Sequence, residues 1–482
     1  MPRWPGGLIR KTPVTPAGPY QNGSAPGVWT MAEAAYWTKQ GLWPVAGNVE
    51  PAGQMVWIGS NSSNTTTVSS YSWTVPTGVT SISAVVVGAG QSGATDDAGA
   101  SGGAGGALRY ATSIAVTPGE TLTIEAGDGV YGATGQTSGG ASSIKRGGTT
   151  LLFAGVGTGT AIGGTIGGGN GGTTGTPSAT RSAGGGGAGG YSGSGGSGQN
   201  ADLSFSSPPS GGGAYGGTGS TSRGGTAGGV GLLGQGASGT GTTATTQFGS
   251  NGYAGYTNDP IGYGVYGAGG AGNDSASGTS GASGAGAVRI IWGASRAFPS
   301  NAADYIPASS SSFSQIEIRM NIPNRFNGSS GNFVDYFYFT ALEIYDENNV
   351  NFMTSLTPVA ASNSTSFSSI STGQFTVNQH DSATSAEVGY LIDGVDSLYL
   401  NTRQTDFGNA SSIKIFVKPS TAKRISKIVI KAYGADQPYR YTLNYVQVLG
   451  DGVDITNGYA IPVKTYTGAT SADTISHTLT FT

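Results

Sequence analysis

Residues 184–190 read GGGGAGG, the densest part of a glycine-rich stretch that decides how the middle of this chain can fold. Of the 88 glycines, 67 lie between Gly88 and Gly293, so that about a third of this stretch is glycine. The glycines follow no strict three-residue period with proline, which excludes a collagen triple helix. The stretch is therefore either a disordered linker or a domain whose backbone packs in an ordered way.

Runs typical of β-strands at both borders of the stretch favour order. Residues 81–87 (SISAVVV) precede it and residues 287–292 (AVRIIW) follow it. Within the stretch, residues 113–117 and 121–126 flank the Pro-Gly pair 118–119. Two such runs around a turn predict a hairpin.

Apolar islands such as 151–153 (LLF) and 230–233 (VGLL) recur among the glycines, whereas flexible linkers do not usually carry such clusters. Bare glycine backbones can approach closely while each residue keeps one donor and one acceptor. Extended polyproline-II-like helices have no internal hydrogen bonds, so several packed side by side can share their amides and offset the entropy cost of ordering glycine. We expect such a lattice, with loops at its ends. The expected loops are residues 200–210, 240–248 and 253–261.

Residues 1–54 differ in kind, because they hold four of the seven tryptophans and several prolines. Thr30 as N-cap and Gly41 just past the end predict a short helix over residues 31–40. Aromatic side chains without a core of their own are typical of interface anchors. We therefore expect a docking arm, with the alternative that the tryptophans pack onto the next domain. The expected docking residues are Trp4, Trp29, Tyr36, Trp37 and Trp43.

From residue 297 to residue 482, glycine falls to ordinary levels and alternating apolar and polar runs appear. Short runs separated by Asn, Gly and Pro turns predict an all-β sandwich or jelly roll. The chain is thus expected to be mostly β with glycine-rich polyproline-II-like helices. We expect three domains: the arm at 1–54, a glycine-rich domain with flanking strands at 55–296, and the sandwich at 297–482. The alternating runs are 315–320, 336–344, 412–417, 426–433 and 441–449.

Charge and cysteine content exclude several classes of function. The formal net charge is −3 and 10% of the residues are charged, so we expect no nucleic-acid partner and no polybasic contact with lipid. The absence of cysteine excludes disulfides and thiolate sites. No apolar run reaches the length of a signal peptide or of a membrane span. We therefore expect no membrane insertion and no export by that route, which disfavours a bacterial surface adhesin and fits release inside an assembled particle.

Catalytic chemistry has few candidates in this sequence. The two histidines, His380 and His477, lie in polar or terminal sequence and are expected at the surface. Glycosidases use pairs of acids, but acid pairs between strands and turns are expected to be solvated or to cap turns. We expect no catalytic residue, no enzyme activity and no cofactor. The pairs are Glu343/Asp346, Asp393/Asp396 and Asp451/Asp454, of which Asp393 and Asp396 are also candidate calcium ligands.

Isolated aromatic side chains among small residues favour recognition as the function. Tyrosine among serine, glycine and asparagine is typical of adaptable binding surfaces, because it gives contact area at a low entropy cost. The alternative is that part of this set caps the glycine lattice. The candidate receptor contacts are Tyr191, Phe205, Tyr215, Phe248, Tyr253, Tyr256, Tyr263 and Tyr266.

Several stretches resemble parts of phage structural proteins. Residues 8–16 (LIRKTPVTP), 27–30 (GVWT) and 36–44 (YWTKQGLWP) resemble an N-terminal signature in structural proteins of marine phages. Residues 73–80 (WTVPTGVT) and 286–293 (GAVRIIWG) resemble the borders of the glycine-rich domain in phage tail fibres.

The two larger domains resemble further families. The middle of the chain is similar in style to the polyglycine-helix adhesins of tailed phages, whose distal loops contact the host receptor. Residues 341–346, 391–394 and 441–449 are similar to galactose-binding, discoidin-like jelly rolls, although the tryptophan expected after the Asp-Gly element is absent.

These resemblances imply a fibre protein located on a virion. Its N-terminal arm would attach to other virion structural proteins, and the chain would recognise a glycan or protein on the host cell surface. Fibres of this kind commonly assemble as symmetric homo-oligomers, and we expect a trimer. The alternatives are a purely structural head, neck or baseplate fibre without receptor binding, and a tailspike depolymerase.

Overall fold

The computed structural model describes a molecule whose regular structure is almost entirely β. Four antiparallel or mixed sheets of five or six strands dominate, with two two-stranded sheets beside them. Helix among the described residues is limited to α2 (Ser385–Gly389) and the 3₁₀ turns η1 (Met353–Ser355) and η2 (Phe367–Ser369). The described residues are 52–63, 66–95, 99–131, 135–161, 166–179, 181–202, 204, 224–225, 227–235, 266–272, 281–302, 304, 306, 311–321, 326–327, 332–333, 336–362, 364–378, 383–393, 400–403, 413–433, 443–467 and 474–481.

The expected docking arm falls outside this set. The first described strand, β1 (Gly53–Ile58), crosses the expected boundary between the arm and the next domain. The predicted helix over residues 31–40 and the expected docking residues Trp4, Trp29, Tyr36, Trp37 and Trp43 all lie outside the described residues.

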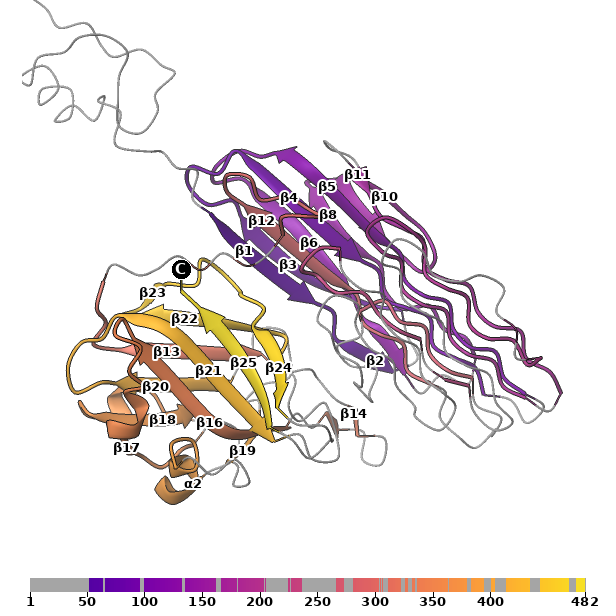
Figure 1. Ribbon diagram of the computed structural model, residues 1–482. Coiled ribbons are helices and arrows are strands. Elements are labelled where there is room, and N and C mark those ends of the chain that lie inside the picture. The colour runs from indigo at the N-terminus through magenta and orange to yellow at the C-terminus, as the bar shows by residue number, and fades with distance from the viewer. Residues whose placement is uncertain are drawn as a thin grey trace, which may run out of the picture.

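Two five-stranded sheets form a sandwich in the first half of the chain (Figure 1). The strand order is β1-β12-β4-β5-β11 in one sheet and β10-β9-β8-β6-β3 in the other. β4 precedes most of the glycine-rich stretch and β12 follows it, yet the two are antiparallel neighbours. The strands after β1 are β3 (Val68–Thr74), β4 (Ser81–Val87), β5 (Leu108–Ala115), β6 (Thr121–Gly127), β8 (Ser142–Arg146), β9 (Thr149–Ala154), β10 (Gly159–Ala161), β11 (Ile166–Gly167) and β12 (Ala287–Trp292), with β2 (Asn61–Ser63) and β7 (Gly129–Tyr131) as a short parallel pair.

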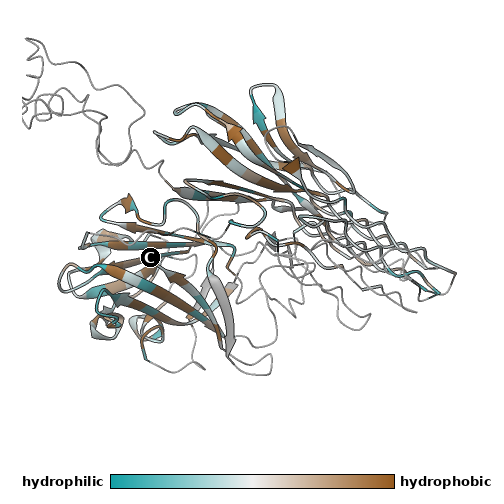
Figure 2. Cartoon of the chain, turned by 45° about the horizontal axis from the view of Figure 1, so that its top comes forward, coloured by the Kyte–Doolittle hydropathy of each residue, from teal (hydrophilic) through white to brown (hydrophobic). Residues whose placement is uncertain are grey.

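The strands at both borders of the glycine-rich stretch have the predicted bounds and are buried on both faces. In β4, Ile82 and Val86 point into the core between the two sheets. Val85 and Val87 point to the opposite face, which is also covered. A strand with two buried faces reads as a nearly continuous apolar run, which explains the sequence SISAVVV. Figure 2 shows such hydrophobic residues in brown along the strands of both halves.

The predicted hairpin around the Pro-Gly pair 118–119 was wrong. β5 and β6 flank this turn, but β5 pairs with β4 and β11, whereas β6 pairs with β3 and β8. The turn therefore carries the chain from one sheet of the sandwich to the other. Turn residues predict a reversal of the chain, but they do not determine whether the two strands pair with each other.

The glycine segments continue the strands of the sandwich away from the sheet (Figure 1). Antiparallel strands repeat their hydrogen bonds every two residues. In the segments that follow β4 and precede β5, the hydrogen bonds repeat every three residues instead. The bonds, each 2.9 Å, run from the amides of Gly88, Gln91 and Ala94 to the carbonyls of Ala107, Ala104 and Ser101.

Residues 185–190, at the centre of the glycine segments, donate their amides to three different neighbours in turn. The amides of Gly185, Gly186 and Gly187 donate to the carbonyls of Gly225 (3.1 Å), Gly103 (2.8 Å) and Gly196 (2.9 Å). The next three residues repeat the pattern: Ala188 donates to Gly228 (3.1 Å), Gly189 to Gly106 (2.9 Å) and Gly190 to Gly193 (2.8 Å). The expected sharing of amides between neighbouring segments is therefore confirmed here. We call this array of hydrogen-bonded glycine segments the glycine lattice.

The glycine lattice needs glycine for space rather than for unusual backbone angles. None of the glycines between 184 and 190 has a positive φ. A Cβ atom on Gly186 would lie 2.2 Å from the carbonyl oxygen of Gly172, and one on Gly189 would lie 2.2 Å from that of Gly169. Any side chain at these positions would push the neighbouring backbones apart and break the shared hydrogen bonds.

We predict that Gly186→Ala destabilises the glycine-rich domain by about 1–3 kcal/mol or more, the usual range for overpacking. Gly148→Ala is the matched control, because a Cβ atom there would meet nothing within 4 Å and Gly148 has no positive φ. Chemical denaturation measures the free energy of unfolding, and hydrogen exchange of the amides at 185–190 should accelerate only in Gly186→Ala. Equal stability of the two variants would contradict a close-packed lattice.

A second sandwich fills the C-terminal part of the chain, as predicted. Its sheets have the orders β17-β18-β20-β13-β22-β23 and β19-β16-β21-β25-β24, and one apolar core lies between them. The strands are β13 (Ile316–Asn321), β16 (Tyr336–Asp346), β17 (Thr357–Pro358), β18 (Gln374–Asn378), β19 (Leu400–Arg403), β20 (Ile413–Lys418), β21 (Ile425–Tyr433), β22 (Tyr445–Gly450), β23 (Val453–Asp454), β24 (Val463–Thr467) and β25 (Thr474–Thr480), with β14 (Phe326–Asn327) and β15 (Asn332–Phe333) as a separate pair.

The two sandwiches meet along the free edge of β1, where Gln54 is fully buried. Its amide donates to the carbonyl of Asn457 (2.9 Å), and its carbonyl accepts from the amide of Tyr459 (3.2 Å). Gly458 between them has a φ of +109°, and a Cβ atom there would lie 1.6 Å from the Gln54 oxygen. Glycine is thus required at position 458 for the two backbones to come this close. The side chain of Gln54 donates to Thr456 O (2.9 Å).

A buried ion pair adds a second link across the same boundary. Arg289 of β12 is fully buried, and its Nη2 lies 2.6 Å from Asp304 Oδ1. The other oxygen of Asp304 accepts from the amide of Ile461 in the C-terminal sandwich (2.5 Å). The guanidinium lies over the ring of Phe298, with 5.7 Å between Arg289 Cζ and the ring centroid. One carboxylate therefore ties the first sheet to the second sandwich.

We predict that Asp304→Asn lowers the free energy of unfolding by about 3–5 kcal/mol, because it leaves a buried guanidinium without its counter-charge. Glu120→Gln is the control, since it removes the partner of Arg146 at 3.0 Å in a part-exposed pair. Exposed pairs contribute about 0–1 kcal/mol. Urea denaturation of both variants makes the comparison, and a similar cost for both would rule out the buried pair as a structural link.

Candidate functional site

Two of the eight candidate receptor contacts are described, and both are buried packing residues. Tyr191 is 1% exposed and Tyr266 is 8% exposed. Tyr191 stacks on Phe298 with 5.9 Å between ring centroids, and its hydroxyl donates to the carbonyl of Gly231 (3.0 Å). Burial raises the pKa of Tyr191 well above its usual value. These two tyrosines therefore anchor the lattice to the sheet and are not surface contacts, which corrects their place in the candidate set.

The other six candidates, Phe205, Tyr215, Phe248, Tyr253, Tyr256 and Tyr263, lie outside the described residues. The ends of the flanking segments can nevertheless be placed. Beside the sheet, the amide of Val230 donates to the carbonyl of Tyr266. Further from the sheet, the amide of Gly224 donates to the carbonyl of Gly272. Gly224, which follows residues 205–223 in the sequence, therefore lies at the far end of the lattice. Gln235 and Tyr266, which flank residues 236–265 in the sequence, lie at the sandwich end.

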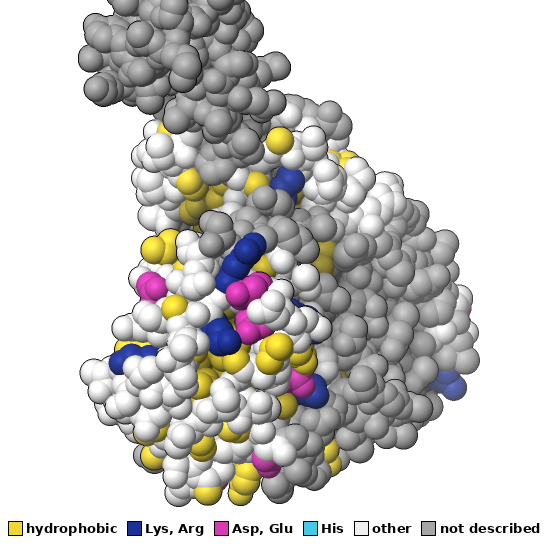
Figure 3. All heavy atoms as spheres, turned by 60° about the vertical axis from the view of Figure 1, so that its left-hand side comes forward, with side chains coloured by type: hydrophobic (Ala, Val, Ile, Leu, Met, Phe, Trp, Pro, Cys, Tyr) yellow, Lys and Arg dark blue, Asp and Glu magenta, His cyan; other side chains and the backbone are white. Residues whose placement is uncertain are grey.

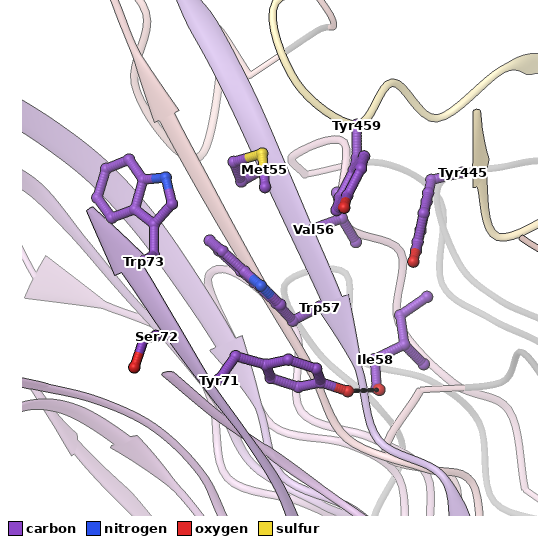
Figure 4. A pocket seen from close by; sticks show the side chains of 9 residues that line it. All are labelled: Met55, Val56, Trp57, Ile58, Tyr71, Ser72, Trp73, Tyr445 and Tyr459. Atoms are coloured by element: carbon purple, nitrogen blue, oxygen red, sulfur yellow. Dashed lines mark hydrogen bonds between the residues drawn. The ribbon is translucent and has the colours of Figure 1, made fainter. Parts of the chain in front are cut away.

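A pocket of about 260 Å³ lies where the two sandwiches meet, at the edge strands β1 and β3 (Figure 4). β1 and β3 lie in different sheets, and the C-terminal sandwich closes the third side. Trp57 and Trp73 meet edge to face, 6.2 Å apart. Tyr445 and Tyr459 stack at 4.4 Å. The lining residues are Met55, Val56, Trp57, Ile58, Tyr71, Ser72, Trp73, Tyr445 and Tyr459. We call this the junction pocket.

Three phenol groups give the junction pocket its polar character. Figure 4 shows Tyr71 reaching from β3 to β1, where its hydroxyl donates to the carbonyl of Ile58 (3.4 Å). Burial is the main cause that raises the pKa of Tyr71, Tyr445 and Tyr459 above the usual value. All three therefore stay protonated near neutral pH and offer hydroxyl donors and acceptors. None of the lining side chains carries a charge.

The described acids of the candidate pairs accept hydrogen bonds from backbone amides or pair with other side chains. Glu343 pairs with Lys431 (2.8 Å) and accepts from the hydroxyl of Tyr345 (2.6 Å). Asp451 caps the amides of Ser314 and Gln315. Asp454 accepts from the amides of Thr456 and Gly458. Asp451 and Asp454 therefore cap backbone amides, as expected, whereas Glu343 pairs with side chains on its own and the neighbouring strand.

His477 is buried, which corrects the expectation that it lies at the surface. It is 1% exposed and its ring centroid lies 6.2 Å from that of Phe337. In β25 it lies on the same face as Ile475 and Leu479, which both belong to the core. The period of two in TISHTLT was a signal that could have predicted this burial. His380 lies outside the described residues.

One of the two candidate calcium ligands is among the described residues. Asp393 is exposed, and Asp396 lies outside the described residues. Across the residues that the structure describes, no three or more His, Asp or Glu side chains gather as a metal site would require.

On the face drawn in Figure 3, basic and acidic side chains lie close together within a largely uncharged surface. This agrees with the pairs Lys431–Glu343 and Lys423–Asp346. Among the described helices, none has the length and hydropathy needed to cross a membrane.

Comparison with known proteins identifies one region of the chain. Residues 65–293 match the family model of a glycine-rich domain, and these residues are a glycine-rich domain. A search of curated proteins found no match. The matched region begins just before β3 and ends one residue after β12, so it covers the glycine lattice and most of the first sandwich.

The junction pocket was missed by sequence reasoning. Its lining comes from residues 55–58, 71–73, 445 and 459, which are far apart in the chain. The closely spaced tryptophans Trp57 and Trp73 were the available signal. Nothing in the sequence indicated that Tyr445 and Tyr459 would line the same pocket, because that depends on how the two sandwiches meet.

We predict that the stabilising effect of Asp346 depends on pH. Burial would raise its pKa, but Lys423 (3.0 Å) and the amides of Val350 and Asn348 outweigh burial and lower it. A lowered folded-state pKa stabilises the fold above the usual value of about 4, and this stabilisation is lost as the pH falls through the folded-state value. The cost of Asp346→Asn, measured by urea denaturation, should therefore be largest at neutral pH and shrink in acid.

The exposed neighbour provides the control for this comparison. Glu347→Gln should change the free energy of unfolding by no more than about 0.5 kcal/mol at either pH. A cost of Asp346→Asn that is the same at neutral and acid pH would contradict the role assigned to the Asp346 carboxylate.

Proposed function

We propose that this protein is a fibre protein of a bacteriophage particle that recognises the host cell surface. The observation that carries the proposal is the glycine lattice, in which the amides of residues 185–190 bond to three neighbours in turn. A lattice of this kind is a rigid support, and rigid supports that carry loops are a common solution for recognition. Two of its connecting stretches, 205–223 and 236–265, contain the six remaining candidate aromatic contacts.

We assign the lattice segments as polyproline-II-like glycine helices. The three-residue repeat of their hydrogen bonds is the repeat of that helix, which has three residues per turn and no internal hydrogen bonds. The C-terminal two-sheet sandwich is consistent with a jelly-roll-like domain. In the proposal, residues 1–51 attach the chain to other virion structural proteins, and the chains assemble as a symmetric oligomer, expected to be a trimer.

Recognition by binding alone is better supported than glycosidase activity. The described acids of the candidate pairs are engaged with the backbone, with lysines or with a tyrosine hydroxyl, and His477 lies in a core. A glycosidase needs two free carboxyl groups across a sugar. The competing proposals are a purely structural head, neck or baseplate fibre and a tailspike depolymerase.

The test is binding of the labelled full chain to an array of bacterial capsular polysaccharides and lipopolysaccharides. We expect binding to part of the array. Replacing residues 205–223 or 236–265 by a Gly-Ser segment of equal length should lower the signal at least tenfold in one of the two variants. The same replacement of residues 468–473, between β24 and β25, is the control and should retain binding.

Three outcomes would count against the proposal. Binding to no member of the array would favour a purely structural fibre. Undiminished binding by both loop variants would remove recognition from the lattice loops. Release of new reducing ends from a bound polysaccharide would make the protein a depolymerase.

A further inference from the structure

The junction pocket has the composition of a binding site rather than of a packing defect. An apolar packing defect is lined by aliphatic and aromatic carbon atoms and stays dry. Here the phenol groups of Tyr71, Tyr445 and Tyr459 are close enough to influence one another electrostatically. Figure 4 shows the rings of Tyr445 and Tyr459 side by side, with their hydroxyls on the same side.

Exposure differs between the base and the rim of the junction pocket. Trp57 and Trp73 are 7% and 6% exposed and form a buried aromatic wall. Tyr71 and Tyr459 are half-buried, and Ser72 is exposed. A ligand that enters would therefore meet the phenol hydroxyls of Tyr71 and Tyr459 first and flat aromatic carbon behind them.

We propose that the junction pocket binds one neutral sugar ring of a glycan. A pyranose has an apolar face of C–H groups and an edge of hydroxyls, which matches an aromatic wall with a rim of hydroxyls. The volume of about 260 Å³ is smaller than the pockets that hold drug-sized ligands, so a single ring is the unit that fits.

The lack of charge among the lining residues defines the class of sugar. Sialic and uronic acids carry a carboxylate that would need a cation or a set of amide donors on binding. The lining residues include no lysine, arginine or histidine. A carboxylate placed against uncharged aromatic walls would lose hydration without compensation. The site therefore selects neutral hexoses over acidic sugars.

This inference goes beyond the proposed function, because no residue of 205–223 or 236–265 is among the lining residues of the junction pocket. Different variants test the two proposals: the loop replacements test the proposed function, and substitutions of Tyr71 and Tyr459 test this inference.

The test is saturation-transfer NMR on the full chain with glucose, galactose and N-acetylglucosamine at millimolar concentration, with sialic acid and glucuronic acid as acidic comparisons. We expect saturation transfer to at least one neutral sugar and none to the acidic ones. Tyr71→Phe and Tyr459→Phe keep the rings and remove one hydroxyl each. Each should weaken the Kd about three- to tenfold, as expected for one lost hydrogen bond.

Tyr345→Phe is the matched control, because Tyr345 lies on β16 and its hydroxyl donates to Glu343, outside the junction pocket. It should bind as the unchanged chain does. The inference is overturned if no neutral sugar shows saturation transfer, if the acidic sugars bind as well as the neutral ones, or if the two pocket variants bind as the control does.

Discussion

Close contact between bare backbones is the constraint on which the rest of this structure depends. At Gly186 and Gly189 a neighbouring carbonyl oxygen lies where a Cβ atom would be. The hydrogen bonds of residues 185–190 form only at that separation. Glycine loses more conformational entropy on ordering than any other residue, so each ordered glycine must bond laterally to compensate. The large aromatic side chains of Tyr191 and Tyr266 lie where the lattice meets the sheet.

The sheet β1-β12-β4-β5-β11 connects the parts of the molecule. One face packs against the second sheet of its own sandwich, and the other is covered by lattice residues, by Phe298 and by Tyr445 of the C-terminal sandwich. The free edge of β1 meets residues 457–459. Because both faces of this sheet and one of its edges are covered, few of its positions can accommodate polar side chains. Arg289 is a fully buried charged residue of this sheet, and Asp304 compensates its charge.

Recognition is proposed for two surfaces of different kinds. One is proposed for residues 205–223 and 236–265, whose sequences hold the six aromatic candidates that remain. The junction pocket is formed by residues of both sandwiches, so its shape depends on the contacts of Gln54 and Asp304. Mutations that loosen this boundary would affect the junction pocket and leave the lattice in place, since the hydrogen bonds of residues 185–190 do not involve the second sandwich.

The amino-acid sequence by itself determined three features: the strands that border the lattice, that the glycine segments pack in an ordered way, and the two-sheet C-terminal domain. These follow from local composition and from periods of two, which act over a few residues. Tertiary structure alone decided that β5 and β6 lie in different sheets, that Tyr191 and His477 are buried, and that Trp57 and Trp73 line one pocket together with Tyr445 and Tyr459. The physical reason is that these outcomes depend on which distant surfaces pack together, and local patterns do not encode the partner.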